Sequence, residues 1–350
     1  METPLHSGKP DSPSAHRGAP RFLFVLGAPR SGTSWIQKSL SEQEGWVTVP
    51  ELHYAVEVLK PVLNAWSRKA AKLERSLEAL QRGGHQSERL IGMPVSMEFE
   101  ELARALRQPL ESLVERARAT YGTIDVFLEK TPSNSALVPQ LSQVFPDGYM
   151  LHVVRDPRSM VRSLRSAGLE WGADWAPRSV LVCALMWRTF VAAARRGSKV
   201  APHYLEVKYE DARRDLGGEI SRVRSWLGVP EPTRSAVAGN GVDRHEIVSA
   251  RVARVLGSTA VGEPEGFGDG STARAELTRA QRWLVELVTA QLMEECGYAV
   301  ESGSAKRINR LLERLARPIV TRMPENRRED FSLNLHLLRP TSWVQSRLRK

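Results

Sequence analysis

The residues from Gly27 to Ser34 have the composition and spacing of a loop that binds phosphate. Four residues separate Gly27 from Gly32, as in loops that close around the phosphates of nucleotides. The nucleotide triphosphatase version has a lysine directly after the second glycine, but this chain has Thr33 there and carries its cation inside the loop as Arg30. Such a loop can hold a single 5′-phosphate and direct a guanidinium at a bridging oxygen, without gripping a triphosphate and Mg²⁺.

Arg155 is a second candidate for binding an anion. Arg155 directly follows an apolar segment over residues 149–154, and Pro157 is suited to the first position of a new helix. An arginine can bind a phosphate with two parallel hydrogen bonds. Ligands of open α/β sheets bind at the carboxyl ends of the strands, so we expect Arg155 and the loop at Gly27 to converge.

A mostly parallel sheet is the architecture that would bring these segments together. Short apolar segments alternate with segments of helical periodicity, which predicts an α/β fold with helices on both faces of the sheet. The expected strands cover residues 21–26, 46–49, 124–128, 149–154 and 203–207. The expected helices cover residues 33–41, 54–118 with a break at 83–84, 180–194, 219–227 and 273–296.

The distribution of charge and periodicity divides the chain into three parts. Residues 1–19 are expected to be disordered, residues 20–300 to form one domain, and residues 301–350 to form a basic tail with a helical extension. The tail has twelve Lys or Arg and five Asp or Glu, and so carries +7 of the chain's net charge of +10. A charge concentrated in one tail does not favour a domain built to bind nucleic acid.

The tail contains one amphipathic helix, expected over residues 306–323. Its apolar face consists of Ile308, Leu311, Leu312, Leu315 and Ile319. The pattern fits packing on the domain, association with another subunit, or contact with an anionic membrane surface. The sequence leaves these three alternatives open.

The composition favours a cytoplasmic protein, with membrane association through the tail as an open alternative. No apolar run approaches the about 18 residues of a membrane span, and the first residues lack the apolar stretch of a signal peptide. Cys183 and Cys296 are expected to be reduced core residues. The histidines show no metal-ligand spacing, and no metal site is predicted.

The segment Gly27-Ala-Pro-Arg-Ser-Gly-Thr-Ser-Trp35 resembles the 5′-phosphosulfate loop of the sulfotransferase superfamily, whose sulfuryl donor is 3′-phosphoadenosine 5′-phosphosulfate (PAPS). The resemblance implies that the 5′-phosphate and sulfuryl contacts come from Arg30, Ser31, Gly32, Thr33 and Ser34. It also implies that Trp35 packs on adenine, and that Arg155 and Ser163 hold the 3′-phosphate. It extends over residues 20–300, although Gly266–Gly270 lacks the Lys or Arg of the family's late glycine-rich loop.

The resemblance implies that the sulfuryl group of PAPS is transferred to an acceptor by in-line displacement at sulfur. This reaction needs a base that removes the acceptor proton, and cations near the leaving oxygen. We assign the cations to Arg30 and Lys130. The cytosolic branch of the superfamily has its basic histidine at the position of Pro132, so that base is absent here. The segment from Val49 to His53 resembles the Pro-Glu-Thr-His region of protein-tyrosine, carbohydrate and many bacterial sulfotransferases, which favours Glu51 as the base and leaves His53 as its rival.

Two other classes of protein remain as alternatives. A P-loop kinase or nucleotide hydrolase would use Asp156, which follows an apolar strand, as its Mg²⁺ ligand. A non-catalytic nucleotide or nucleic-acid binding protein would use the basic tail. The acceptor, an alcohol or an amine on a carbohydrate, lipid, peptide or small natural product, is not specified by the sequence.

Overall fold

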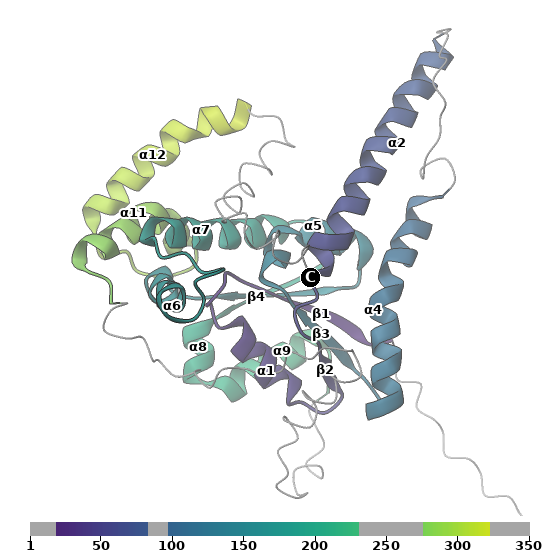
Figure 1. The fold of residues 1–350 in the computed structure, drawn as a ribbon, viewed down its shortest axis with the longest axis horizontal. Helices are drawn as coiled ribbons and strands as arrows, with labels where there is room; N and C mark the ends of the chain where they lie inside the picture. The colour runs from purple at the N-terminus through teal and green to yellow at the C-terminus, as the bar shows by residue number, and fades with distance from the viewer. Residues whose placement is uncertain (1–18, 83–96, 231–275, 323–350) are drawn as a thin grey trace, which may run out of the picture.

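The computed structural model of the chain describes residues 19–82, 97–230 and 276–322. Its described part contains a sheet of five parallel strands in the order β2-β3-β1-β4-β5 (Figure 1). The strands are β1 (Arg21–Leu26), β2 (Trp46–Thr48), β3 (Val126–Lys130), β4 (Tyr149–Val154) and β5 (His203–Lys208). All pairs are parallel, so the carboxyl ends of all five strands meet at one edge of the sheet. The predicted α/β class is confirmed.

Helices cover both faces of the sheet because the apolar side chains of the strands alternate between two cores. Phe22 and Phe24 of β1 belong to one core, whereas Leu23 and Val25 belong to the other. The Leu23 side packs against α1 (Thr33–Ser41), α8 (Tyr209–Arg214) and α9 (Leu216–Leu227). The Phe22 side packs against α2 (Lys60–Gln81), α4 (Phe99–Tyr121) and α5 (Val138–Val144).

A third core lies among helices that follow β4 in the sequence. Trp187 is fully buried in it, and the same core includes Val154 at the end of β4. The helices are α6 (Pro157–Glu170), α7 (Val180–Gly197) and α11 (Arg279–Glu295). The last described helix, α12 (Gly303–Arg322), lies on the outer side of α11 (Figure 1). Cys183 and Cys296 are buried free thiols in this core, as the sequence predicted.

Several boundaries differ from the sequence prediction. The third strand begins at Val126 instead of residue 124 and ends at Lys130, so Lys130 belongs to the strand instead of following it. The helix expected from residue 273 begins at Arg279, because Thr278 and Gln281 form a capping box at its N-terminus. The helical stretch after residue 54 opens as a π-helix, Ala55–Leu59, before α2 begins.

Some predictions fall on residues outside the described part. These are residues 1–18 of the segment 1–19 that was predicted to be disordered, the glycine-rich segment Gly266–Gly270 and the end of the tail, 323–350. The predicted division into a domain and a tail stays a prediction, as does the cytoplasmic location. Among the described helices, none combines the length and the hydropathy that crossing a bilayer requires.

Candidate functional site

The predicted site residues follow neighbouring strands of the sheet. Glu51 comes after β2, Lys130 ends β3, Arg30 follows β1 and Arg155 follows β4. Because these four strands are adjacent and parallel, their carboxyl ends place the four residues along one edge. The sequence predicted that the loop at Gly27 and Arg155 converge. They do so because β1 and β4 are neighbours in the sheet.

The loop after β1 depends on its two glycines. Gly27 has φ 152°, and a Cβ there would lie 2.7 Å from both the Thr33 methyl group and the Val153 carbonyl oxygen. Gly32 has φ 90°, and a Cβ there would overlap the ring of Tyr209. Both positions therefore require glycine. Gly32 is also the N-cap of α1 and brings no capping side chain, so the first N–H groups of the helix are left for a ligand.

In the phosphate loop and the turn after β4, two buried polar atoms have no hydrogen-bond partner within the described residues. They are the Ser31 hydroxyl, in a fully buried residue, and Nε of the half-buried Arg155. A buried polar group without a partner is costly, and a bound ligand can supply the missing partner. The donors present, a hydroxyl and a guanidinium, suit a phosphate oxygen. The phosphate loop and the turn after β4 thus fit an anionic ligand.

The structure brings Arg30, Arg155 and Ser163 together. Nε of Arg30 donates a hydrogen bond of 3.2 Å to the Ser163 hydroxyl, and the Arg155 guanidinium donates one of 3.1 Å to the Arg30 carbonyl oxygen. Burial, and next the charge of Arg155, lower the pKa of Arg30. Neither arginine forms an ion pair with an acidic side chain in the described part of the chain. Two guanidinium groups without an acidic partner attract an anion.

Aromatic rings lie beside this pair of arginines. The Arg155 guanidinium lies 4.3 Å from the centroid of the Tyr209 ring, and the Trp35 ring meets Tyr209 edge-on at 5.6 Å. The guanidinium of Arg213 lies 5.6 Å from the Trp35 centroid. Trp35 is half-buried. The contact of Trp35 with adenine stays a prediction.

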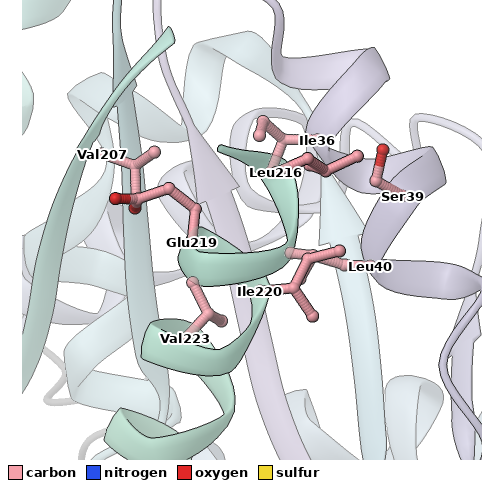
Figure 2. A pocket seen from close by; sticks show the side chains of 8 residues that line it. All are labelled: Ile36, Ser39, Leu40, Val207, Leu216, Glu219, Ile220 and Val223. Carbon is pink, nitrogen blue, oxygen red and sulfur yellow. The ribbon is translucent and has the colours of Figure 1, made fainter. Parts of the chain in front are cut away.

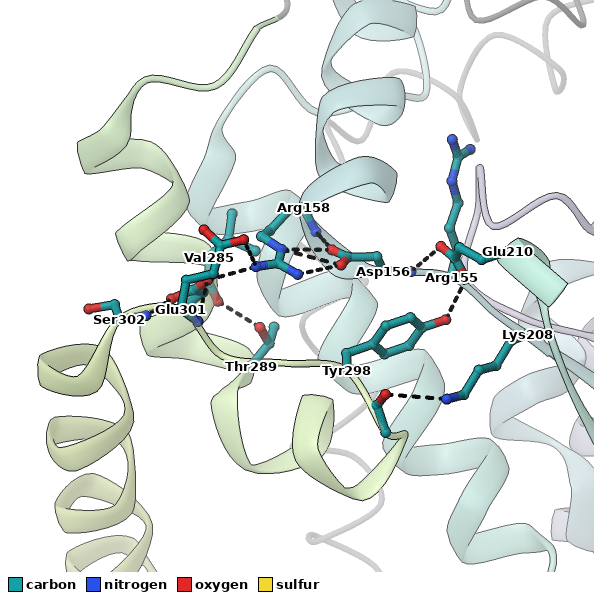
Figure 3. Close-up of polar contacts among 12 residues, drawn as sticks. Arg155, Asp156, Arg158, Lys208, Glu210, Val285, Thr289, Tyr298, Glu301 and Ser302 are labelled. Carbon is teal, nitrogen blue, oxygen red and sulfur yellow. Dashed lines mark hydrogen bonds and ion pairs between the residues drawn. The ribbon is translucent and has the colours of Figure 1, made fainter. Parts of the chain in front are cut away.

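The turn that carries Arg155 is fixed from three sides, and Figure 3 shows the contacts that Glu210 makes with Asp156 and Tyr298. Nε1 of Trp187 donates to the Arg155 carbonyl oxygen at 2.8 Å, and the backbone N–H of Asp156 donates to Glu210 at 3.0 Å. Tyr298 donates its hydroxyl proton to the other oxygen of Glu210 at 2.8 Å. The Arg155 backbone is therefore held by residues of α7, α8 and the segment after α11. No sequence motif pointed to Tyr298.

Arg158 links the start of α6 to the C-terminal helices (Figure 3). Its guanidinium contacts Asp156 at 2.6 Å, Glu301 at 2.8 Å and the buried Glu286 at 3.0 Å. Asp156 also caps α6 by accepting a hydrogen bond from the Arg158 backbone N–H. The Asp156 carboxylate is engaged in this network, and this does not favour its use as the Mg²⁺ ligand of a kinase.

The second group of predicted residues lies after β2 and β3. Nζ of Lys130 donates to Oε1 of Glu51, and Nε2 of His53 lies 3.6 Å from Oε2 of the same carboxylate. The Lys130 side chain is only 7% exposed, whereas that of Glu51 is 37% exposed. The predicted base is thus in direct contact with a predicted cation and with its rival base.

Glu129 holds the loop that carries Glu51. It is 2% exposed, and its carboxylate accepts hydrogen bonds from the Leu52 backbone N–H at 3.3 Å, the Thr131 hydroxyl at 2.5 Å and the Asn134 side-chain amide. Burial raises the pKa of Glu129 and outweighs these hydrogen bonds, which act to lower it. The sequence did not predict that Glu129 holds this loop, because the burial of its side chain becomes evident only once β3 is placed in the sheet.

A small hollow between α1 and α9 is distinct from this edge (Figure 2). Its lining is mostly apolar and consists of Ile36, Ser39, Leu40, Val207, Leu216, Glu219, Ile220 and Val223. None of the predicted site residues lines it. Within residues 19–82, 97–230 and 276–322, no three His, Cys, Asp or Glu side chains are grouped to hold a metal ion.

Comparison with known proteins gives one family match. Residues 20–233 match the sequence profile described as "Sulfotransferase family". No curated protein matches the chain.

Similar solved structures include the sulfotransferase domain from the curacin biosynthetic pathway, with 17% identity, a TM-score of 0.41, and coverage of 81% of this chain and 99% of that chain. The sulfotransferase domain of the Synechococcus PCC 7002 olefin synthase has 19% identity, a TM-score of 0.40, and coverage of 85% and 100%. Sulfotransferase STF9 from Mycobacterium avium has 17% identity, a TM-score of 0.41, and coverage of 81% and 78%. With TM-scores below 0.5, these similarities support no assignment of individual residues.

Proposed function

The chain belongs to the sulfotransferase family, and from this we propose that it transfers the sulfuryl group of PAPS to a hydroxyl or amine of an acceptor. The proposal goes beyond the family in three respects: PAPS is the donor, Glu51 is the base, and single residues are given roles. The predicted kinship with the protein-tyrosine and carbohydrate branch is retained as part of it.

The observation that carries the donor assignment is the pair of arginines at the phosphate loop. Arg30 and Arg155 lie together without an acidic partner among the described residues, and the Nε of Arg155 has no partner there. Their two loops follow adjacent strands, so one ligand with two separate phosphate groups can reach both. The loop after β1 also lacks the lysine that would grip a triphosphate. A nucleotide with a 5′-phosphosulfate and a 3′-phosphate matches this arrangement.

The proposed reaction is an in-line displacement at sulfur. The acceptor oxygen or nitrogen forms a bond to sulfur, the bond from sulfur to the phosphate oxygen breaks, and adenosine 3′,5′-bisphosphate leaves. Glu51 removes the acceptor proton, while Arg30 and Lys130 stabilise the negative charge that grows on the leaving oxygen. Lys130 contacts the Glu51 carboxylate directly, so the proposed base and one of the proposed cations lie together.

The donor assignment is tested by calorimetric titration with adenosine 3′,5′-bisphosphate and, for comparison, with ATP. We expect the bisphosphate to bind more tightly than ATP, and Arg155→Ala to weaken bisphosphate binding about 30-fold, because hydrogen bonds to a charged group are lost. Arg155→Lys should recover only part of the affinity, because lysine lacks the planar fork. Arg222→Ala removes an arginine of α9 that pairs with Glu219, and serves as the matched control.

Either of two results would count against the proposal. ATP binding as tightly as the bisphosphate would point to a nucleotide-hydrolysing or kinase activity. Equal affinities of the wild type, Arg155→Ala and Arg222→Ala would remove Arg155 from the site.

A further inference from the structure

The helix α12 is fixed to α11 along one of its faces. Ala305 and Asn309, one turn apart, are fully or almost fully buried. The Asn309 side chain accepts a hydrogen bond of 3.2 Å from the Gln291 backbone N–H and donates one of 2.7 Å to the Leu287 carbonyl oxygen. These contacts set the rotation of α12 about its own axis, and they determine which side chains turn outward.

The adjoining face of α12 exposes three large apolar side chains. Ile308, Leu311 and Leu312 are 40%, 55% and 52% exposed. Their spacing of three and four residues places them on one side of the helix. No described residue covers them, so the domain accounts for only part of the apolar stripe predicted from the sequence.

Basic side chains flank these apolar residues. Arg307 and Arg314 are exposed and have no ion-pair partner in the described part of the chain, whereas Lys306 and Arg310 both pair with Glu294 of α11. In the sequence, residues 303–322 carry six Lys or Arg and a single Glu. The outward side of α12 therefore combines an apolar strip with arginines that have no acidic partner among the described residues.

We propose that the exposed face of α12, defined by Ile308, Leu311, Leu312, Arg307 and Arg314, binds the surface of an anionic lipid membrane. Apolar side chains that enter the boundary between headgroups and acyl chains, together with arginines that meet anionic headgroups, are the two components of interfacial binding. A second copy of the chain is a poorer partner, because it would bring two basic helices together. The site edge of the sheet takes no part in this binding, so the proposal is independent of the transfer reaction.

The test is co-sedimentation of the full chain with phosphatidylcholine vesicles, with and without phosphatidylserine, at low and high salt. We expect binding only to the vesicles with phosphatidylserine, and weaker binding at high salt. Replacing Leu311 and Leu312 together by serine should weaken binding about tenfold, and so should replacing Arg307 and Arg314 together by glutamine. Val200→Ser changes an apolar residue that is 57% exposed elsewhere on the domain, and should bind as the wild type does.

Three outcomes would overturn the proposal. The first is no binding of the wild type to either kind of vesicle. The second is unchanged binding of the doubly substituted leucine variant, with its folding confirmed by its circular dichroism spectrum. The third is a wild-type dimer, detected by light scattering, that the same leucine variant dissociates, because the face would then bind a second copy.

Discussion

Removing the Tyr298 hydroxyl as Tyr298→Phe tests whether a residue beyond the family match supports the Arg155 turn. The hydroxyl donates to Glu210 at 2.8 Å, and Glu210 in turn accepts the Asp156 backbone N–H at 3.0 Å. A hydrogen bond to a charged group contributes about 1.5–3 kcal/mol, but the half-buried Glu210 can regain part of this from water. We therefore expect a loss of about 1 kcal/mol of bisphosphate binding, which corresponds to about fivefold weaker affinity.

The assay compares titration of adenosine 3′,5′-bisphosphate with titration of AMP, which has no 3′-phosphate. If Tyr298 acts by holding Arg155, the affinity for the bisphosphate should fall while that for AMP stays constant. A fall of equal size for both ligands would indicate a general loosening of the domain, and no change for either would refute the reasoning. The melting temperature of the variant separates an effect on the site from an effect on folding.

Three further predictions use glutamate-to-glutamine changes. Glu51→Gln should lower kcat by about 10²–10⁴ without changing bisphosphate affinity, and turnover near the wild-type rate would assign the base elsewhere. Glu129→Gln should lower the free energy of unfolding by about 1–3 kcal/mol and reduce kcat. The reason is that one of the donors to the buried carboxylate, such as the Leu52 N–H, loses its acceptor. Unchanged stability in urea would contradict this. Burial acts to raise the pKa of Glu206, but hydrogen bonds from His152 and a neighbouring arginine outweigh it and lower the pKa to about 2. The stability contributed by ionised Glu206 is therefore present above pH 4.5 and lost as the pH falls toward 2. In Glu206→Gln the melting temperature should depend less on pH over that range.

Some local elements of this chain could be predicted from the sequence to the residue. The bounds of β1, α1 and β4 agree with the prediction, because each is set by a short apolar run or by a glycine or proline next to it. Gly228 ends α9 in the left-handed conformation, as its position after the helical pattern indicated. The chemistry of the phosphate loop was likewise visible, because all its residues are consecutive.

The sequence by itself determined the elements, the phosphate loop and the positions of the candidate arginines and carboxylates. The tertiary structure decided which of these residues meet. Glu51 and Lys130 are 79 residues apart, and Arg30 and Ser163 are 133 apart, yet the strand order makes each pair neighbours. The physical reason is that local periodicity depends on nearby residues, whereas strand order and the burial of Glu129 depend on packing across the whole sheet.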